Sequence, residues 1–452
     1  MSNRDGARRP RTILVVSYYY PPSGGPGVQR VLKFTRYLPA HGYHPVILTV
    51  PEDAAFPMRD PTLAAEIPPE ARVVRSPIRE YYHLFRSSKG TEPDSGAGYL
   101  VTTAHHALGW RERAIQWIRA TAFIPDGRMG WLAGGTRAGI QAARKEKAQL
   151  VFASGPPFTA HWIARRIASA LELPLVLDFR DPWTRAPFYP RRPAPSRMLD
   201  ERLERSCLER ADAIVTVNQG IREDFLARYP SLGPSRFHVI SNGFDPADFT
   251  GDPPPAPDVW ILTHTGTLPS ARFPRGFIGA LRRLVAEEPG LTGRLRVRFL
   301  GRMEPELLAA LTAPPLDSIV RFEGYRPHAE SIRALRESRL LLLFIEDGPQ
   351  ARGILTGKLF EYLGSGAPIL ALAPEGEAAE LIRRTRCGRV VPGDDVNAVH
   401  AALRSALDAF RAGDRPFGQP DLTAVAAYTR PALTERLAAL FDALLEEAQA
   451  ET

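Results

Sequence analysis

The chain has 452 residues, 44% of them hydrophobic and 24% charged, which is the balance of a folded protein and leaves room for two domains of roughly 200 residues. The formal net charge of +8 suits phosphate-bearing partners or an anionic membrane surface, and a solvated basic surface explains it equally well. No basic run interleaved with aromatic residues and no zinc-finger or helix-turn-helix signature occurs, which argues against nucleic-acid binding.

The cysteines and the first residues of the chain indicate the cellular compartment to expect. Cys207 and Cys387 occur singly, so we expect neither a disulfide nor a structural zinc. Residues 1–11 are polar and basic without the apolar segment of a secretion signal, and no apolar run reaches the roughly 18 residues of a membrane span. We therefore expect a cytoplasmic protein.

The first half alternates short β-branched runs with amphipathic stretches. Residues 12–18 predict a buried strand, 28–41 a helix and 45–50 a second strand. The same alternation returns later in this half, with a strand, a helix and two further strands at 149–154, 160–172, 175–179 and 212–218.

The alternation fails over residues 79–131, which we interpret as an insertion. Within it, residues 110–123 predict an amphipathic helix with arginine on one side and tryptophan, isoleucine and phenylalanine on the other. Such a helix suits a membrane surface, and it also suits an ordinary core.

The proline-rich stretch 251–258 predicts a linker, and the alternation of strands and helices restarts after it. The final stretch, 430–447, predicts a helix without a following strand that packs back on the first domain. The predicted strands of the second half are 260–266, 294–301, 318–324, 340–345, 368–373 and 388–391. The predicted fold is therefore α/β, with two doubly wound Rossmann-like domains at 1–250 and 259–429, a linker at 251–258 and a terminal helix at 430–452.

The strongest candidate site follows the predicted strand 340–345. In open parallel sheets ligands bind at the carboxyl ends of strands, which places a ligand at the loop 346–355. Thr356 is a suitable N-cap for the next helix, and Gly357 lets a phosphate approach its free N–H groups. Lys358 and Glu361 share one helix face. Lys358 could neutralise a phosphate while Glu361 accepts hydrogen bonds from two sugar hydroxyls, or the two could form a plain surface ion pair.

The first domain offers a glycine loop before its first helix. Gly24, Gly25 and Gly27 let the backbone approach a phosphate or sugar closely, although such a loop is also an ordinary turn. The spacing is not that of a dinucleotide site, and no acidic residue follows about 20 positions on, so nicotinamide binding is disfavoured.

Polar residues end another predicted strand of the first domain. Asp178, Arg180 and Asp181 are candidates to orient an acceptor hydroxyl, and an internal arginine–aspartate pair that fixes the loop is the alternative. Asp126 and Trp131 come from the insertion and face the same cleft or serve the structure.

The first strand of the second domain ends in His264, Thr265, Gly266 and Thr267. Arg272 follows closely, and because arginine binds diphosphate oxygens with two N–H groups, it is a candidate clamp for a leaving group.

Taken together, these residues resemble the retaining glycosyltransferases of family 4, which have the two-domain GT-B fold. The resemblance runs from about residue 12 to 391 through YYYPPSGGPGVQRVLKF, DFRDPW, ISNGFD, HTGTL and GKLFEYLGSGAPILAL, the last being the most specific. The family implies a nucleotide-sugar donor held mainly by the C-terminal domain and an acceptor held by the N-terminal one.

The resemblance assigns roles to individual positions. It implies that Glu361 binds ribose and that Arg272 and Lys358 contact the diphosphate. It puts the strand-end catalytic region, often a histidine in the family, at Arg180 and Asp181. Asp126 and Asp178 remain the acceptor-side candidates. The expected donor-binding set is Gly24, Gly25, Gly266, Thr267, Arg272, Thr356, Gly357, Lys358, Leu359 and Glu361.

One departure concerns the two glutamates that the family often carries eight positions apart. The position eight before Glu361 is Gly353, so Glu346 or Asp347 substitutes for the first glutamate, or backbone amides bind the donor sugar.

The chemistry implied by the resemblance is transfer with retention, in which the acceptor hydroxyl attacks as the nucleotide diphosphate leaves. We see no DxD motif and expect no metal and no cofactor, with a UDP- or GDP-sugar as donor and a glycan or lipid-linked acceptor. Cell-surface polysaccharide or glycolipid synthesis, with attachment to the inner face of a membrane, would suit the basic charge. A nucleotide-sugar epimerase of the same fold and a catalytically silent nucleotide-sugar-binding partner are the alternatives.

Overall fold

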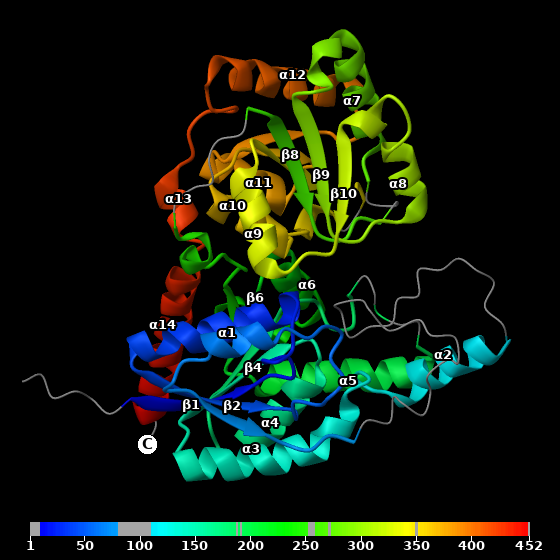
Figure 1. Ribbon diagram of the computed structural model, residues 1–452. Coiled ribbons are helices and arrows are strands. Elements are labelled where there is room, and N and C mark those ends of the chain that lie inside the picture. The colour runs from blue at the N-terminus through cyan, green and yellow to red at the C-terminus, as the bar shows by residue number, and fades with distance from the viewer. Residues whose placement is uncertain are drawn as a thin grey trace, which may run out of the picture. The chain divides into compact units, whose positions relative to one another are not determined.

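The computed structural model describes residues 10–79, 110–186, 189, 192–251, 258–269, 273–348 and 351–450. It divides into two compact units, which are Met1–Ser241 with Leu433–Thr452, and Asn242–Ala432. Each unit is built on one parallel sheet with helices on its faces (Figure 1). The predicted α/β fold with two Rossmann-like domains is confirmed.

The sheet of the first unit has seven strands in the order β3-β2-β1-β4-β5-β6-β7. Its interior strand β1 is inaccessible to solvent from Ile13 to Val16, as expected for a parallel strand covered on both faces. The strands are β1 (Arg11–Val16), β2 (Tyr43–Thr49), β3 (Arg72–Arg75), β4 (Leu150–Gly155), β5 (Leu175–Phe179), β6 (Ala213–Thr216) and β7 (Phe237–Val239). The helices before the terminal one are α1 (Pro26–Tyr37), α2 (Trp110–Ala122), α3 (Leu132–Glu146), α4 (Thr159–Leu171), α5 (Ala194–Arg210) and α6 (Gln219–Arg228).

The C-terminal helix α14 (Arg430–Ala450) is shared between the units, and from Leu433 onward it belongs to the first. Phe441 is fully buried and packs edge-on against Tyr43 and Phe152. Asp442 accepts hydrogen bonds of 2.6 Å from both Arg11 and the hydroxyl of Tyr43. This helix therefore completes the hydrophobic core of the first unit.

The sheet of the second unit has six strands in the order β10-β9-β8-β11-β12-β13. One hydrophobic cluster covers the face under α7 and α12, and another covers the face under α9, α10 and α11. The strands are β8 (Trp260–Thr265), β9 (Leu295–Leu300), β10 (Val320–Gly324), β11 (Leu340–Phe344), β12 (Ile369–Leu372) and β13 (Gly388–Val391). The helices are α7 (Arg275–Glu287), α8 (Pro305–Leu311), α9 (His328–Glu337), α10 (Gly357–Ser365), α11 (Glu377–Thr385), α12 (Val396–Ala412) and α13 (Leu422–Ala426).

The division between the units falls after Ser241, ahead of the predicted linker at 251–258. Phe244 is buried in the cluster under α10 and packs edge-on against Phe249, so this segment belongs to the second unit. Residues 252–257 lie outside the described part.

Two short edge strands, β3 and β7, were not predicted, because four and three residues at a sheet edge leave little periodicity to recognise. The predicted insertion at 79–131 lies largely outside the described residues, which resume at Trp110. Trp110 and Trp117 of α2 are 76% and 60% exposed, so this helix is not an ordinary core helix. No helix in the described part of the chain is long and apolar enough to cross a membrane.

Candidate functional site

The second unit has its topological switch point between β8 and β11. The chain leaves β8 toward one side of the sheet and returns to β11 on the other, which opens a crevice at their carboxyl ends. His264 and Thr265 end β8, the exposed Gly266 and Thr267 follow, and α10 begins close by at Gly357. This is the place where a parallel α/β sheet binds a ligand.

Lys358 in the first turn of α10 reaches across this crevice to the end of β8. Its ammonium Nζ lies 3.4 Å from Nε2 of His264. His264 is buried and stacks on Phe344, and its Nδ1 lies 2.9 Å from the carbonyl oxygen of Leu342. Because a carbonyl only accepts, Nδ1 carries the proton and Nε2 offers a lone pair to Lys358.

Burial holds the pKa of His264 well below its ordinary value, and the positive charge of Lys358 acts in the same direction. A neutral imidazole therefore positions the ammonium without a competing charge. The sequence singled out Lys358 and did not reveal this support, since the two residues are 94 positions apart.

Gly266 makes room for the lysine. A Cβ at this position would lie 3.0 Å from Nζ of Lys358, and the φ of +100° is one that glycine adopts without strain. The neighbouring backbone N–H of Thr265 is held by the buried hydroxyl of Tyr362 at 2.9 Å. Tyr362 of α10 thus fixes the end of β8, while Gly266 and Thr267 in the loop that follows stay exposed.

Glu361 lies one turn further along α10 and is about one-third exposed. Burial raises the pKa of its carboxyl, and His328 opposes this, its Nδ1 lying 3.9 Å from Oε1 of Glu361. The same histidine ring approaches Asp248 with Nε2, at 3.4 Å from Oδ2. Neither His328 nor Asp248 was predicted as a site residue.

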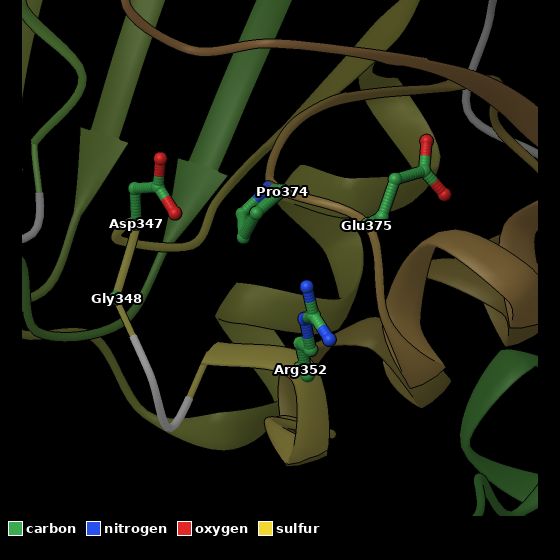
Figure 2. A pocket seen from close by; sticks show the side chains of 5 residues that line it. All are labelled: Asp347, Gly348, Arg352, Pro374 and Glu375. Carbon is green, nitrogen blue, oxygen red and sulfur yellow. The ribbon is translucent and has the colours of Figure 1, made fainter.

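A pocket of about 470 Å³ opens between the loops that follow β11 and β12. Figure 2 shows the guanidinium of Arg352 directed into the middle of this pocket, with the carboxylate of Asp347 on its rim. Glu375 closes another side and is bound by Arg383, whose Nη1 donates a 2.6 Å hydrogen bond. Pro374 and Gly348 complete the lining. The position of the missing first glutamate, Gly353, directly follows Arg352 in the turn Ala351–Gly353.

The other predicted donor-site residues lie at the start of α10 or outside the described part. The Leu359 side chain is completely buried in the core, and its N–H donates to the carbonyl of Thr356. Thr356 occupies the N-cap position, but its hydroxyl makes no capping hydrogen bond to any described residue. Arg272, the predicted leaving-group clamp, lies outside the described residues.

In the first unit, Arg180 ties three loops together at the carboxyl edge of the sheet. Its Nη1 donates to the carbonyl of Gly27 at 2.6 Å, its Nε to that of Gly155 at 3.2 Å, and its Nη2 to that of Pro156. The glycine loop is itself fixed, since Gly25 caps α1 with a φ of +83° and the N–H of Gly24 donates to Met58.

The carboxylates of Asp178 and Asp126, the predicted acceptor-side residues, are both bound by other groups of the first unit. Asp178 is fully buried, with one oxygen bound by Arg30 at 2.7 Å and the other by Ser154 at 2.7 Å. Asp126 is 6% exposed, and its carboxylate accepts hydrogen bonds from the N–H and hydroxyl of Thr159, the first residue of α4. Neither has a carboxylate directed at solvent.

Asp181 differs from these two because it is only half-buried. Burial raises the pKa of its carboxyl, and the adjacent Arg180 guanidinium opposes that effect. Trp131 is completely buried, and its indole N–H donates to Ser76, which is a core role.

Two α/β units of this kind, each built on one parallel sheet, are the architecture of the GT-B fold. The model of the family described as Glycosyltransferase Family 4 matches residues 96–248, which agrees with the family resemblance found in the sequence.

A curated relative, the α-maltose-1-phosphate synthase of Mycolicibacterium smegmatis, is 41% identical over 69 residues. That stretch is 14% of this chain and 16% of the relative, so the likeness is local.

Solved structures share the fold over nearly the whole chain. A glycosyltransferase from Rickettsia africae aligns with a TM-score of 0.61 and 12% identity, covering 97% of this chain and 99% of that one. Anabaena HepE in complex with UDP aligns with a TM-score of 0.59 and 14% identity, covering 96% and 100%.

Proposed function

We propose that this protein is a retaining glycosyltransferase that moves a sugar from a nucleotide-diphosphate sugar to an acceptor hydroxyl. The observation that carries this proposal is the ammonium of Lys358, set 3.4 Å from neutral His264 above Gly266 at the start of α10. A cation, an exposed glycine backbone and a helix N-terminus converge there, which is the environment that a diphosphate requires. The Anabaena neighbour, crystallised with UDP, makes a UDP-sugar our first choice of donor.

In the proposed reaction, the bond between the anomeric carbon and the diphosphate oxygen breaks while a bond to the acceptor oxygen forms on the same face. The acceptor proton passes to the departing diphosphate, so atoms and charge balance. Lys358 and the N–H groups of α10 neutralise the charge that develops on the leaving group. Glu361 accepts hydrogen bonds from the two ribose hydroxyls and fixes the nucleoside end of the donor.

The pocket of Arg352 and Asp347 is our candidate for the donor sugar. The guanidinium and the rim carboxylate offer donors and acceptors to ring hydroxyls, where the family often has a glutamate. Asp347, rather than Glu346, lines this pocket and is our proposed substitute for that glutamate.

The acceptor is proposed to be a cell-surface glycan or lipid-linked sugar. The exposed tryptophans of α2 support docking on an anionic membrane, together with the charge of +8. Flotation with phosphatidylglycerol vesicles tests this, and Trp110→Ala with Trp117→Ala should reduce the floated fraction. Equal flotation of both forms would remove the helix from the proposal.

The experiment that tests the central proposal is a calorimetric panel of UDP, GDP, ADP, TDP and their sugars in EDTA. The wild type should bind one nucleotide family, Lys358→Met should lose roughly 10- to 150-fold in affinity, and Glu361→Ala should lose affinity for the nucleoside portion. Lys145→Met, which removes an exposed lysine of the first unit, is the matched control. Absence of binding by the wild type would refute the proposal.

An epimerase of the same fold is the alternative enzyme. Incubation with donor alone should leave the sugar unchanged if our proposal holds, whereas an isomerised nucleotide-sugar would identify the epimerase. The anomeric configuration of the transferred sugar, read by NMR, tests retention. A partner that binds nucleotide-sugar without catalysis would pass the binding test and transfer nothing to any acceptor.

A further inference from the structure

Three ionisable side chains form a row in the second unit. Asp248 lies in the turn Pro246–Phe249, His328 is the first residue of α9, and Glu361 is in the middle of α10. The imidazole of His328 has one nitrogen facing each carboxylate, Nε2 at 3.4 Å from Asp248 and Nδ1 at 3.9 Å from Glu361. Their side chains are 21%, 30% and 34% exposed, so they can exchange protons with solvent.

The chemistry of imidazole makes this arrangement sensitive to protonation. A neutral ring has one N–H and one lone pair, whereas the charged ring has two N–H groups. If Nε2–H of His328 donates to Asp248, the neutral ring turns a lone pair toward Glu361. Only the protonated ring can bind both carboxylates, and it then favours the ionised form of Glu361.

Besides His328, three charged side chains act on the carboxyl of Glu361, and they come from different elements of the second unit. Lys358 lies one turn earlier on α10, and Arg430 stands at the start of α14; both favour an ionised Glu361, as His328 does, while Asp248 opposes it. Burial raises the pKa of the Glu361 carboxyl, so its ionised form depends on these cations. Among the cationic residue types here, histidine is the one whose ordinary pKa lies near neutral pH.

We propose that His328 is a positioning residue for Glu361, held by Asp248, and that it makes recognition of the donor ribose depend on pH. This inference rests on the proposed function, because it assumes that Glu361 accepts hydrogen bonds from the vicinal ribose hydroxyls. Protonated His328 holds one carboxylate oxygen of Glu361 and leaves the remaining lone pairs for these hydroxyls. As pH rises and His328 becomes neutral, that support is lost and ribose is recognised less well.

The experiment compares UDP with 2′-deoxy-UDP by calorimetry at pH 6 and pH 8. The ratio of the two dissociation constants reports ribose recognition, and the ionisation of the diphosphate cancels in it. For the wild type we expect the preference for UDP to fall by about fivefold or more from pH 6 to pH 8, the lower end of typical coupling between sites. His328→Gln should show a small preference that is equal at both pH values. His328→Lys, which keeps a charge throughout, should retain the preference at pH 8.

A matched control is available in the same unit. His400 also pairs with a glutamate, with Nε2 at 2.8 Å from Glu287 Oε2, and it lies on α12. His400→Gln should leave the wild-type pH dependence of the ratio intact, which separates the effect from general loss of a histidine–glutamate pair. Asp248→Asn should weaken the dependence without abolishing binding.

The outcomes distinguish this inference from the proposed function. If the wild type binds UDP with the same ribose preference at both pH values, or if His328→Gln keeps the wild-type dependence, the inference is overturned and the proposed function stands. If the wild type binds no nucleotide in the panel, the proposed function fails and this inference falls with it.

Discussion

The close approach of Gly266 and Lys358 allows the diphosphate site to be tested by adding a single methyl group. In Gly266→Ala the new Cβ would lie 3.0 Å from Nζ and 3.1 Å from Cε of Lys358, so the ammonium must move away. Because the clash is with the end of a flexible side chain, the steric cost to folding is small. The φ of +100° is strained for alanine and costs about 1–3 kcal/mol.

This strain lowers the stability of the free and the bound protein alike, so a loss of affinity reports on the displaced ammonium instead. A charge-assisted hydrogen bond contributes about 1.5–3 kcal/mol, so a displaced ammonium should weaken binding of the diphosphate by roughly 10- to 150-fold. Calorimetry with UDP on Gly266→Ala, Lys358→Met and the double variant measures this. In the Lys358→Met background the alanine should cost little further affinity, because the group that it displaces is already gone.

Gly290→Ala is the control for the methyl group itself. Gly290 lies in the same unit, with an ordinary φ and no described heavy atom within 4 Å of the added Cβ. Its affinity for UDP should equal that of the wild type. If Gly266→Ala stays folded and binds UDP as tightly as the wild type, the ammonium of Lys358 does not contact the diphosphate, and the placement of the site is wrong.

Three further predictions concern the first unit. Asp178→Asn leaves the buried Arg30 without its compensating charge and should cost about 3–5 kcal/mol in urea unfolding; an unchanged midpoint would contradict the structural role. Burial lowers the pKa of His161 from 6.5 to about 4, so its stabilising contribution is present above pH 6.5 and is lost as pH falls toward 4. The free energy of unfolding should therefore fall by about 2 kcal/mol from pH 7 to pH 5 through this group, a component that His161→Gln should lack. Arg180→Lys cannot reach all three carbonyls with one ammonium and should lower the unfolding temperature of the first unit, whereas an unchanged temperature would show that the loops hold without it.

The sheets were predictable because hydrophobic periodicity is a local property. The buried run of Leu340–Phe344 and the largely apolar run of Leu175–Phe179 give their strands directly, and their alternation with helices implies parallel order. The short edge strand Phe237–Val239 lacks such a run and was missed.

The partners of polar side chains were not predictable in this way. Asp178 was correctly placed at a strand end, but the sequence could not show that Arg30, 148 positions away, uses its carboxylate. An internal arginine–aspartate pair does form, but with Arg30, whereas the neighbouring Arg180 binds backbone carbonyls. The charge of a residue and its place on a strand can be read from the neighbouring sequence. Whether its carboxylate is already hydrogen-bonded by other side chains depends on which distant segments meet in the fold.

The contacts of Lys358 bear on whether Lys358 and Glu361 form a ligand-binding site or a surface ion pair. Three positions along a helix put Lys358 and Glu361 on one face, and that spacing fits either interpretation. In the folded unit the two side chains are held by different partners, Lys358 by the neutral His264 and Glu361 by His328. A simple ion pair would need neither histidine. Because each charge has its own positioning group on a separate element, this arrangement supports our proposal that the pair makes two contacts with one extended ligand, a diphosphate at one end and a ribose at the other.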